Sequence, residues 1–315
     1  MSRILLTGAS GFIGSHCLNA LRDRGHELHA VVRTVKATIS DGVTWHYRDL
    51  REPEQAAEIV AKVQPELLLH CAWIATPGLY ATSPENVAWL QSTVALVEAF
   101  GKHGGRRLVG IGTSAEYDPG DRPCSEDVTP ISPSTIYGKS KAATWLAIQA
   151  LAQQHGISAC WARLFVPYGP GDSPRRLIPY VTSSLAAGAR VETTLGLQVR
   201  DFIFACDAAD LIVRLLLGQD TGAFNVGTGV PSSIRSVVEY LADACGRREL
   251  VQFGARQPAP GDPQVLVADM TKVERCLRWS AATDLRAGLD RVLAAMGATV
   301  GATVPAAARD EANRT

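Results

Sequence analysis

Short apolar runs alternate with longer amphipathic stretches along the first half of the chain. The apolar runs have the length and composition of buried strands, at Arg3–Thr7, Glu27–Val32, Val43–Tyr47, Glu66–His70, Arg107–Ile111 and Ser158–Leu164. The stretches between them have helical periodicity, at Gly11–Arg24, Pro53–Val63, Pro84–Gly101 and Tyr137–His155. Because strands that alternate with helices form a parallel sheet covered on both faces, the pattern predicts an α/β fold built on a doubly wound parallel sheet.

The pattern changes after Phe165, where prolines and glycines mark a long loop. Beyond it, helices are predicted at Arg175–Gly188, Asp207–Leu217, Ile234–Ala244 and Leu285–Met296, and a strand at Arg200–Phe204. A turn is predicted to begin at Asn225-Val226-Gly227. We therefore expect two parts, the second a smaller α/β substrate lobe interleaved with the first. The expected divisions are a dinucleotide-binding domain at 1–164 with returning segments near 200–230, a lobe at 165–296 and a disordered tail at 297–315.

Composition narrows the function classes. The chain has 315 residues and equal numbers of basic and acidic side chains, 31 of each, so no general attraction to nucleic acid or to an anionic membrane is expected. Its seven cysteines include no CxxC pair and are interpreted as buried hydrophobes rather than as disulfides or metal ligands. We expect no metal site. The absence of a signal peptide or a membrane-length apolar run favours a cytoplasmic protein.

A glycine motif follows the first predicted strand. Gly8, Gly11 and Gly14, with Phe12 and Ile13 between them, lie where the chain turns from that strand into a helix. Gly8 would permit the turn, Gly11 would let backbone approach a pyrophosphate, and Gly14 would let helix and strand pack closely. The phosphates would bind at the N–H groups of the helix start. Such glycines also occur in ordinary turns, but this context predicts a bound dinucleotide on a Rossmann fold.

A second motif carries candidate catalytic residues. Tyr137 and Lys141 are four residues apart and share one face of a predicted helix. A nearby ammonium group favours the phenolate of a tyrosine, which makes Tyr137 a candidate general acid or base for interconverting a hydroxyl and a carbonyl. Lys141 could also hold the ribose of a nicotinamide. Thr113 follows a predicted strand and would point its hydroxyl at the same cleft; the alternative is that it only satisfies nearby backbone.

With these residues in place, the chain resembles the extended short-chain dehydrogenases/reductases from about Ile4 to Leu277. This branch contains nucleotide-sugar epimerases, dehydratases and reductases. Further matching segments are Asp49-Leu50, His70-Cys71-Ala72, Asn86-Val87, Arg163, Tyr168-Gly169-Pro170-Gly171, Arg200-Asp201-Phe202, Asp207 and Asn225-Val226-Gly227. The resemblance implies a hydride-transfer enzyme with a nicotinamide cofactor and a nucleotide-diphosphate sugar as substrate. It places Asp49 and Leu50 beside the adenine and Ala72 beside the cofactor.

The end of the second predicted strand bears on the choice of cofactor. Relatives that prefer NAD carry an acidic residue there, which binds the ribose diol. This chain has Arg33 instead, which could pair with a 2′-phosphate through a bidentate contact. We therefore expect NADP(H) over NAD(H), the alternative being that Arg33 is a solvated surface residue.

Substrate residues follow from the resemblance alone. It implies that Arg200 and Arg256 contact the nucleotide diphosphate, although the spacing from Arg256 to the following Gly-Asp is longer than usual. Many relatives also have an asparagine where this chain has Val166.

The residues beside Thr113 separate the reactions of the family. Dehydratases carry Asp-Glu after the threonine and decarboxylases a glutamate two residues after it, whereas this chain has Ser114 and Ala115. We expect strand alternation to turn Glu116 away from the cleft. The favoured function is NADPH-dependent reduction of the C4 ketone of a nucleotide-linked 4-keto-6-deoxyhexose, as in deoxysugar biosynthesis. The alternatives are a nucleotide-sugar 4-epimerase that keeps NAD bound and a non-catalytic NADP-binding protein.

A homodimer is also expected from the resemblance. In relatives the helices that correspond to Pro84–Gly101 and Tyr137–His155 pack against their copies. Such a surface would suit the apolar residues of both helices, and so would packing on the sheet; they are Trp89, Leu90, Val94, Trp145 and Leu146.

Overall fold

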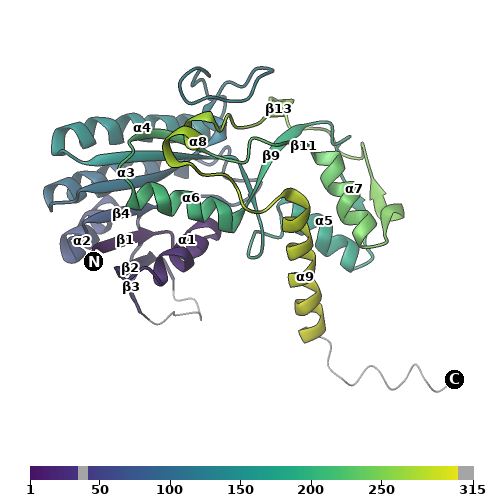
Figure 1. Ribbon diagram of the computed structural model, residues 1–315, viewed down its shortest axis with the longest axis horizontal. Helices are drawn as coiled ribbons and strands as arrows, with labels where there is room; N and C mark the ends of the chain where they lie inside the picture. Colours follow the sequence, from purple (N-terminus) through teal and green to yellow (C-terminus); the bar gives the residue numbers. More distant parts are fainter. Residues whose placement is uncertain (35–41, 304–315) are drawn as a thin grey trace.

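A parallel sheet forms the centre of the larger part of the molecule (Figure 1). The computed structural model describes residues 1–34 and 42–303, with backbone alone from 298 onward. The seven strands lie in the order β10-β6-β5-β4-β1-β2-β3, and every neighbouring pair is parallel. Their bounds are β1 Arg3–Thr7, β2 Glu27–Val32, β3 Val43–Tyr47, β4 Leu67–His70, β5 Arg107–Thr113, β6 Ser158–Leu164 and β10 Gly222–Val226. The predicted Rossmann-like α/β class is confirmed.

Helices cover both faces of this sheet. One face carries α1 (Phe12–Arg22) and α6 (Ala205–Leu217), and the other carries α2 (Pro53–Val63), α3 (Glu85–Lys102) and α4 (Ile136–His155). The central strands are apolar on both sides, because successive side chains point to opposite faces and both are covered, whereas the edge strand β3 exposes Thr44 and Tyr47. The two resulting cores are fully buried, for example at Leu6 on the first face and Leu5 on the second.

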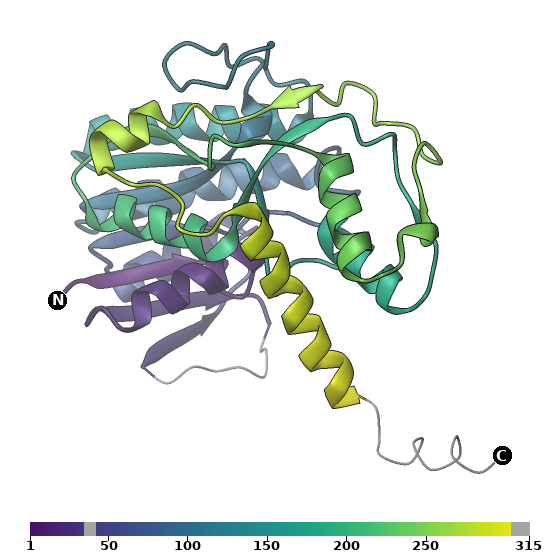
Figure 2. The same ribbon diagram turned by 45° about the vertical axis from the view of Figure 1, so that its right-hand side comes forward.

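The second lobe has small sheets and its own core. β9 (Val199–Phe204) pairs with β7 (Val166–Tyr168), β11 (Pro231–Ser233) and β13 (Val265–Leu266), and β8 (Val191–Glu192) pairs with β12 (Val251–Gln252). The lobe's helical elements are α5 Leu177–Ala186, α7 Ile234–Ala244, η2 Arg248–Leu250 and α9 Leu285–Thr303, whereas α8 Thr271–Leu277 packs against β10 of the large sheet. Figure 2 shows α5 and α7 on the far side of β9 from the large sheet, with α9 in front.

The second half differs from the predicted pattern in two places. Asn225 and Val226 belong to β10, an edge strand of the large sheet, rather than to a turn, because residues 222–226 pair with β6. Helix α9 continues past Met296 to Thr303, so the tail expected from residue 297 begins later, and its residues 304–315 lie outside the described part of the chain. The segments α6 and β10 pack on and pair with the large sheet near residues 200–230.

Among the described residues, no helix is long and apolar enough to cross a membrane.

The packing of α1 on the β1 loop depends on Gly14. A Cβ at this position would lie 2.1 Å from the Gly8 carbonyl oxygen, far inside van der Waals contact. Gly8 itself has a φ of +69° and its Cα faces the backbone of Ala72. The loop therefore holds helix and strand closer together than any residue with a side chain allows.

We expect Gly14→Ala to lower the free energy of unfolding by about 1–3 kcal/mol, because the added methyl group forces backbone apart in a packed core. Urea unfolding measures the change. Gly120→Ala is the control, since a Cβ at Gly120 meets no atom within 4 Å. Equal unfolding midpoints for wild type and Gly14→Ala would contradict the assigned packing.

Candidate active site

The glycine loop forms an open backbone cradle at the carboxyl end of β1. The Gly11 N–H donates to the Gly8 carbonyl at 2.9 Å, which closes the turn, and Gly11 is the extended N-cap of α1. Phe12 and Ile13 then open the helix, where the first N–H groups have no partner within the helix. No acidic side chain lies in this first turn. The cradle therefore fits the pyrophosphate of a dinucleotide.

A buried hydrogen-bonded chain supports the cradle from below. Thr7 bonds to Nδ1 of His70 at 2.8 Å, and Nε2 of His70 bonds to Thr93 on α3 at 2.9 Å. Burial lowers the pKa of His70 to about 3, so the ring is neutral at physiological pH. The Thr7 hydroxyl also accepts a bond from the N–H of Ala72 at 3.2 Å. These hydrogen bonds fix the end of β1 against the end of β4, where Ala72 is buried beside Gly8.

The residues expected at the adenosine end lie near one another. Arg33 is exposed after β2, and its charge contributes to lowering the pKa of Asp49. The larger cause is Arg51, whose Nη2 donates to the Asp49 carboxylate at 2.6 Å. Leu50 is buried and its carbonyl accepts a hydrogen bond from Ser92. The structure thus leaves the Arg33 guanidinium at the surface of this end of the cradle.

The catalytic candidates meet where β5 ends and α4 begins. The Thr113 side chain lies within hydrogen-bonding reach of the Tyr137 hydroxyl. Gly138 makes this approach possible, because a Cβ there would lie 2.4 Å from the Ala115 carbonyl oxygen. Burial raises the pKa of Tyr137 far above its ordinary value, while the bond with Thr113 acts in the opposite direction. The phenol is therefore protonated until a positive charge is added nearby.

Lys141 lies one turn further along α4 and is 4% exposed. Its Nζ donates to the Ile111 carbonyl at 2.7 Å and lies 3.9 Å from the centre of the Trp73 ring. Burial lowers the pKa of this lysine to about 7, and the charge of Glu116 limits the decrease. The ammonium group is thus held close to the point at which it loses its charge, beside the phenol that it would assist.

Three residues that were given no role in the predicted site shape this cleft. The Tyr80 ring meets the Tyr137 ring edge to face at 4.8 Å, and Trp73 forms the wall over Lys141. Glu116 does turn away from the cleft, as expected, but it is fully buried and accepts a hydrogen bond from the Thr113 N–H at 2.8 Å. A short 3-10 turn, η1 (Ser114–Glu116), brings it there. The capping pattern Thr-x-x-Glu is the sequence signal that could have identified it.

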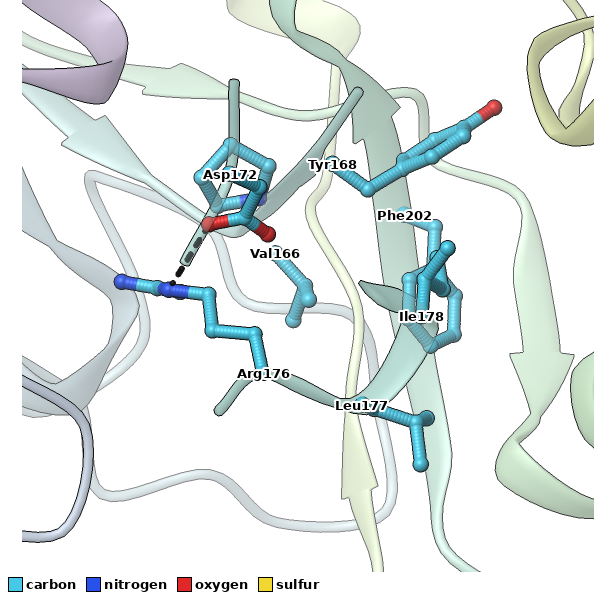
Figure 3. Close-up of a pocket in the computed structure, with 8 residues that line it drawn as sticks. Val166, Tyr168, Asp172, Arg176, Leu177, Ile178 and Phe202 are labelled. Carbon is cyan, nitrogen blue, oxygen red and sulfur yellow. Dashed lines mark ion pairs between the residues drawn. The ribbon is translucent and has the colours of Figure 1, made fainter. Parts of the chain in front are cut away.

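A pocket of about 130 Å³ opens beyond the catalytic candidates, in the second lobe (Figure 3). Its apolar wall contains Val166 and Phe202, and the carboxylate of Asp172 bonds to the guanidinium of Arg176 at 3.3 Å. Burial raises the pKa of Asp172 to about 6. The charge of Arg176 also reaches Tyr137, whose pKa it lowers. The pocket therefore offers a cation near the reactive tyrosine.

The two arginines expected at a diphosphate have carboxylate partners within the lobe. Arg200 is buried and its Nη2 donates to Asp262 at 2.6 Å. Arg256 is exposed, 3.8 Å from the carboxylate of Glu192, and donates to the Tyr180 hydroxyl at 3.3 Å. Asp262 lies in the same loop segment as Arg256. The segment that carries Arg256 is therefore bonded to Arg200 through the Asp262 carboxylate.

Among the described residues, no group of three or more His, Cys, Asp or Glu side chains could hold a metal ion. On α3 and α4, Leu146 is 68% exposed, Trp89 and Leu90 are half-buried, and Trp145 stacks on Trp161 inside the core.

Comparisons with known proteins agree with this geometry. The model of the NAD dependent epimerase/dehydratase family matches residues 4–227. The chain is 28% identical to UDP-glucose 4-epimerase 2 of Oryza sativa subsp. japonica, over 88% of this chain and 78% of that protein. Among solved structures, UDP-glucose 4-epimerase of Thermus thermophilus in complex with NAD has a TM-score of 0.85 at 25% identity, covering 93% and 98% of the two chains.

MoeE5 in complex with UDP-glucose and NAD has a TM-score of 0.83 at 29% identity, covering 95% and 99% of the two chains. The family match confirms the resemblance predicted from the sequence.

The pKa of Lys141 makes stability depend on pH. It is about 7 in the folded protein against an ordinary value of 10.5, so between these values the unfolded chain binds a proton that the folded one does not. Stability should then rise with pH, by up to about 1.4 kcal/mol per pH unit from this residue. Lys141→Met should remove that rise, as measured by urea unfolding between pH 7.5 and 9.5.

Lys139→Met is the matched control, because Lys139 is exposed on the same helix. Its stability should follow that of wild type over the whole range. Parallel curves for wild type and Lys141→Met would show that Lys141 has no such shift.

Proposed function

Because the chain belongs to the NAD-dependent epimerase/dehydratase family, we propose that it is a 4-epimerase of nucleotide-linked hexoses. It is an enzyme of the extended short-chain dehydrogenase/reductase type. The observation that carries the proposal is that Thr113, Tyr137 and the buried Lys141 meet where β5 ends and α4 begins, with Thr113 within hydrogen-bonding reach of the Tyr137 hydroxyl. These groups supply what hydride transfer at a hydroxyl-bearing carbon requires, a proton acceptor and a means of stabilising it.

Each side chain has one part in the proposed reaction. Tyr137 accepts the proton of the C4 hydroxyl as the sugar is oxidised and returns a proton when the ketone is reduced on its other face. Thr113 donates a hydrogen bond that orients the phenol and the sugar oxygen. Lys141 lowers the energy of the phenolate through its positive charge. The glycine cradle at Gly8, Gly11 and Gly14 would hold a nicotinamide dinucleotide, which would supply the hydride chemistry.

The neighbours of Thr113 support hydride transfer without elimination. Ser114 and Ala115 occupy the positions at which relatives that eliminate water or carbon dioxide carry acids. Glu116 is sealed beneath Thr113 at 0% exposure and cannot reach a substrate. The named relatives support the epimerase, since a rice protein and a Thermus protein that resemble this chain are UDP-glucose 4-epimerases.

A 4-ketoreductase is the second candidate function, and Arg33 favours it. This arginine is exposed directly after β2, at the position where relatives that prefer NAD carry an acidic residue. Its guanidinium would suit the 2′-phosphate of NADPH, which a reductase must exchange in every cycle. Solved structures that resemble this chain are complexes with NAD, which supports the other cofactor.

We place the nucleotide sugar in the pocket beside Arg176, with its diphosphate toward Arg200 and Arg256. The apolar wall at Val166 and Phe202 would cover the flat faces of the ligand. The side chain of Val166 cannot form a hydrogen bond with the ligand. The polar contacts at this side of the pocket would therefore come from Arg176. A homodimer through α3 and α4 stays a prediction.

The reaction is tested by incubating the enzyme with UDP- and dTDP-hexoses and with 4-keto-6-deoxy sugars plus NADPH. We expect isomers at C4 without net change in cofactor absorbance. Tyr137→Phe should lower the rate by about 10²–10⁴-fold, because it removes the general acid and base. Tyr240→Phe, in the outer lobe, serves as the control.

Stoichiometric consumption of NADPH with a keto sugar would support the reductase instead. Absence of both reactions over the whole panel would reject hydride transfer at C4.

Arg176→Ala should raise KM for the nucleotide sugar about 10–100-fold with little change in kcat, because a charge-assisted contact is lost from ground and transition states alike. Steady-state kinetics measure both constants. Arg175→Ala is the matched control, since Arg175 is exposed and outside the pocket lining. An unchanged KM in Arg176→Ala would place the substrate elsewhere.

A further inference from the structure

A buried ion pair lies directly behind the catalytic candidates. Glu116 accepts a hydrogen bond from Nε of Arg163 at 2.9 Å and another from Nε1 of Trp161 at 2.9 Å. The side chains of the pair are 0% and 5% exposed. The absence of a side chain at Gly112 makes space for the Glu116 carboxylate and the Trp161 ring. A Cβ there would lie 2.3 Å from the Trp161 nitrogen and 2.8 Å from the Glu116 carboxylate. Burying an ion pair is energetically costly, and this pair is buried directly behind Thr113 at the end of β5.

The Glu116 carboxylate affects all three catalytic candidates, Thr113, Tyr137 and Lys141. It holds the N–H of Thr113, which sets the backbone that carries the Thr113 hydroxyl. Its negative charge raises the pKa of Lys141 against the effect of burial, and it also raises that of Tyr137. Arg163 faces away from these groups, toward the Tyr117 hydroxyl at 3.2 Å and the Tyr117 ring.

We propose that Glu116 is a positioning residue of the active centre: its buried carboxylate fixes the Thr113 backbone and, bonded to the Trp161 indole over which the Lys141 ammonium group lies, supplies the charge opposite that group. Its kinetic consequence rests on the proposed hydride transfer, whereas the charge on Lys141 exists without substrate. Without Glu116, burial alone would favour the neutral lysine, which cannot stabilise a phenolate.

The other groups that face Lys141 differ from Glu116 in charge or distance. From the end of β4, Cys71 raises the pKa of Lys141 less than Glu116 does, and His70 is neutral. From α4 itself, the Tyr137 phenol is protonated in the free enzyme. The Trp73 and Trp161 rings lie 3.9 and 5.6 Å from the Lys141 Nζ and carry no charge. Among these neighbours Glu116 is the carboxylate, and it is paired with Arg163.

The test is a titration of Lys141 by NMR in the full-length enzyme labelled with ¹³C at lysine Cε, with Lys141→Met to assign the signal. In Glu116→Gln we expect the midpoint to fall by about one pH unit, since an anion that raised it is gone. With the midpoint moved from 7 to 6, kcat at pH 7 should fall about fivefold while KM is unchanged, and part of the loss should be recovered at pH 6.

Glu116→Gln leaves Arg163 unpaired and could unfold the protein, so Glu116→Gln/Arg163→Met is measured beside it. The double variant removes the pair without leaving a buried charge, and its Lys141 midpoint should fall equally. Glu116→Asp keeps the charge and should keep a midpoint near that of wild type.

Unchanged midpoints in both Glu116→Gln variants, with lower stability alone, would show a structural brace and overturn the proposal. A wild-type enzyme that is inactive on every nucleotide sugar would reject the proposed function, yet the Lys141 titration would still decide the role of Glu116.

Discussion

The site depends on keeping a lysine charge in a place that water does not reach. Lys141 is packed between α4 and the sheet, where desolvation alone would remove its proton. Three surrounding features oppose that loss: the Ile111 carbonyl, the face of Trp73 and the anion of Glu116. Each of these features comes from a different element. The surroundings that keep the charge of Lys141 are therefore complete only when β5, the loop after β4 and η1 are all in position.

Close backbone approach is the geometric condition that brings these elements together. Gly138 allows the first turn of α4 to lie against the Ala115 carbonyl, and Thr135 caps that turn by accepting from the Gly138 N–H at 3.1 Å. At the other end of the cleft, Gly14 allows α1 to lie against Gly8. The same device thus positions the cofactor cradle and the tyrosine, with His70 bonded between β1 and α3.

Much of this was accessible from the sequence because it follows from local patterns. The strand β1, the glycine turn and the face shared by Tyr137 and Lys141 all depend on residues close together in the chain. The strand β10 was missed because a short edge strand with a polar residue, Asn225, resembles a turn until its pairing with β6 is known. The ion pair between Glu116 and Arg163 joins residues 47 apart, so only the parallel pairing of β5 with β6 reveals it. The pocket at Arg176 depends in the same way on β7 meeting β9.

Arg163 also lies where the chain leaves one lobe for the other. β6 ends in the large sheet at Leu164, and β7 begins at Val166 in the sheet of the lobe. Between them, the N–H of Phe165 donates to the Val226 carbonyl at 3.0 Å, which holds the crossing to β10. The anchored arginine is thus three residues from the wall of the pocket, and its carboxylate partner holds the backbone of Thr113. Arg163 and Glu116 thus link, through buried side-chain contacts, the point where the chain enters the lobe to the backbone of Thr113.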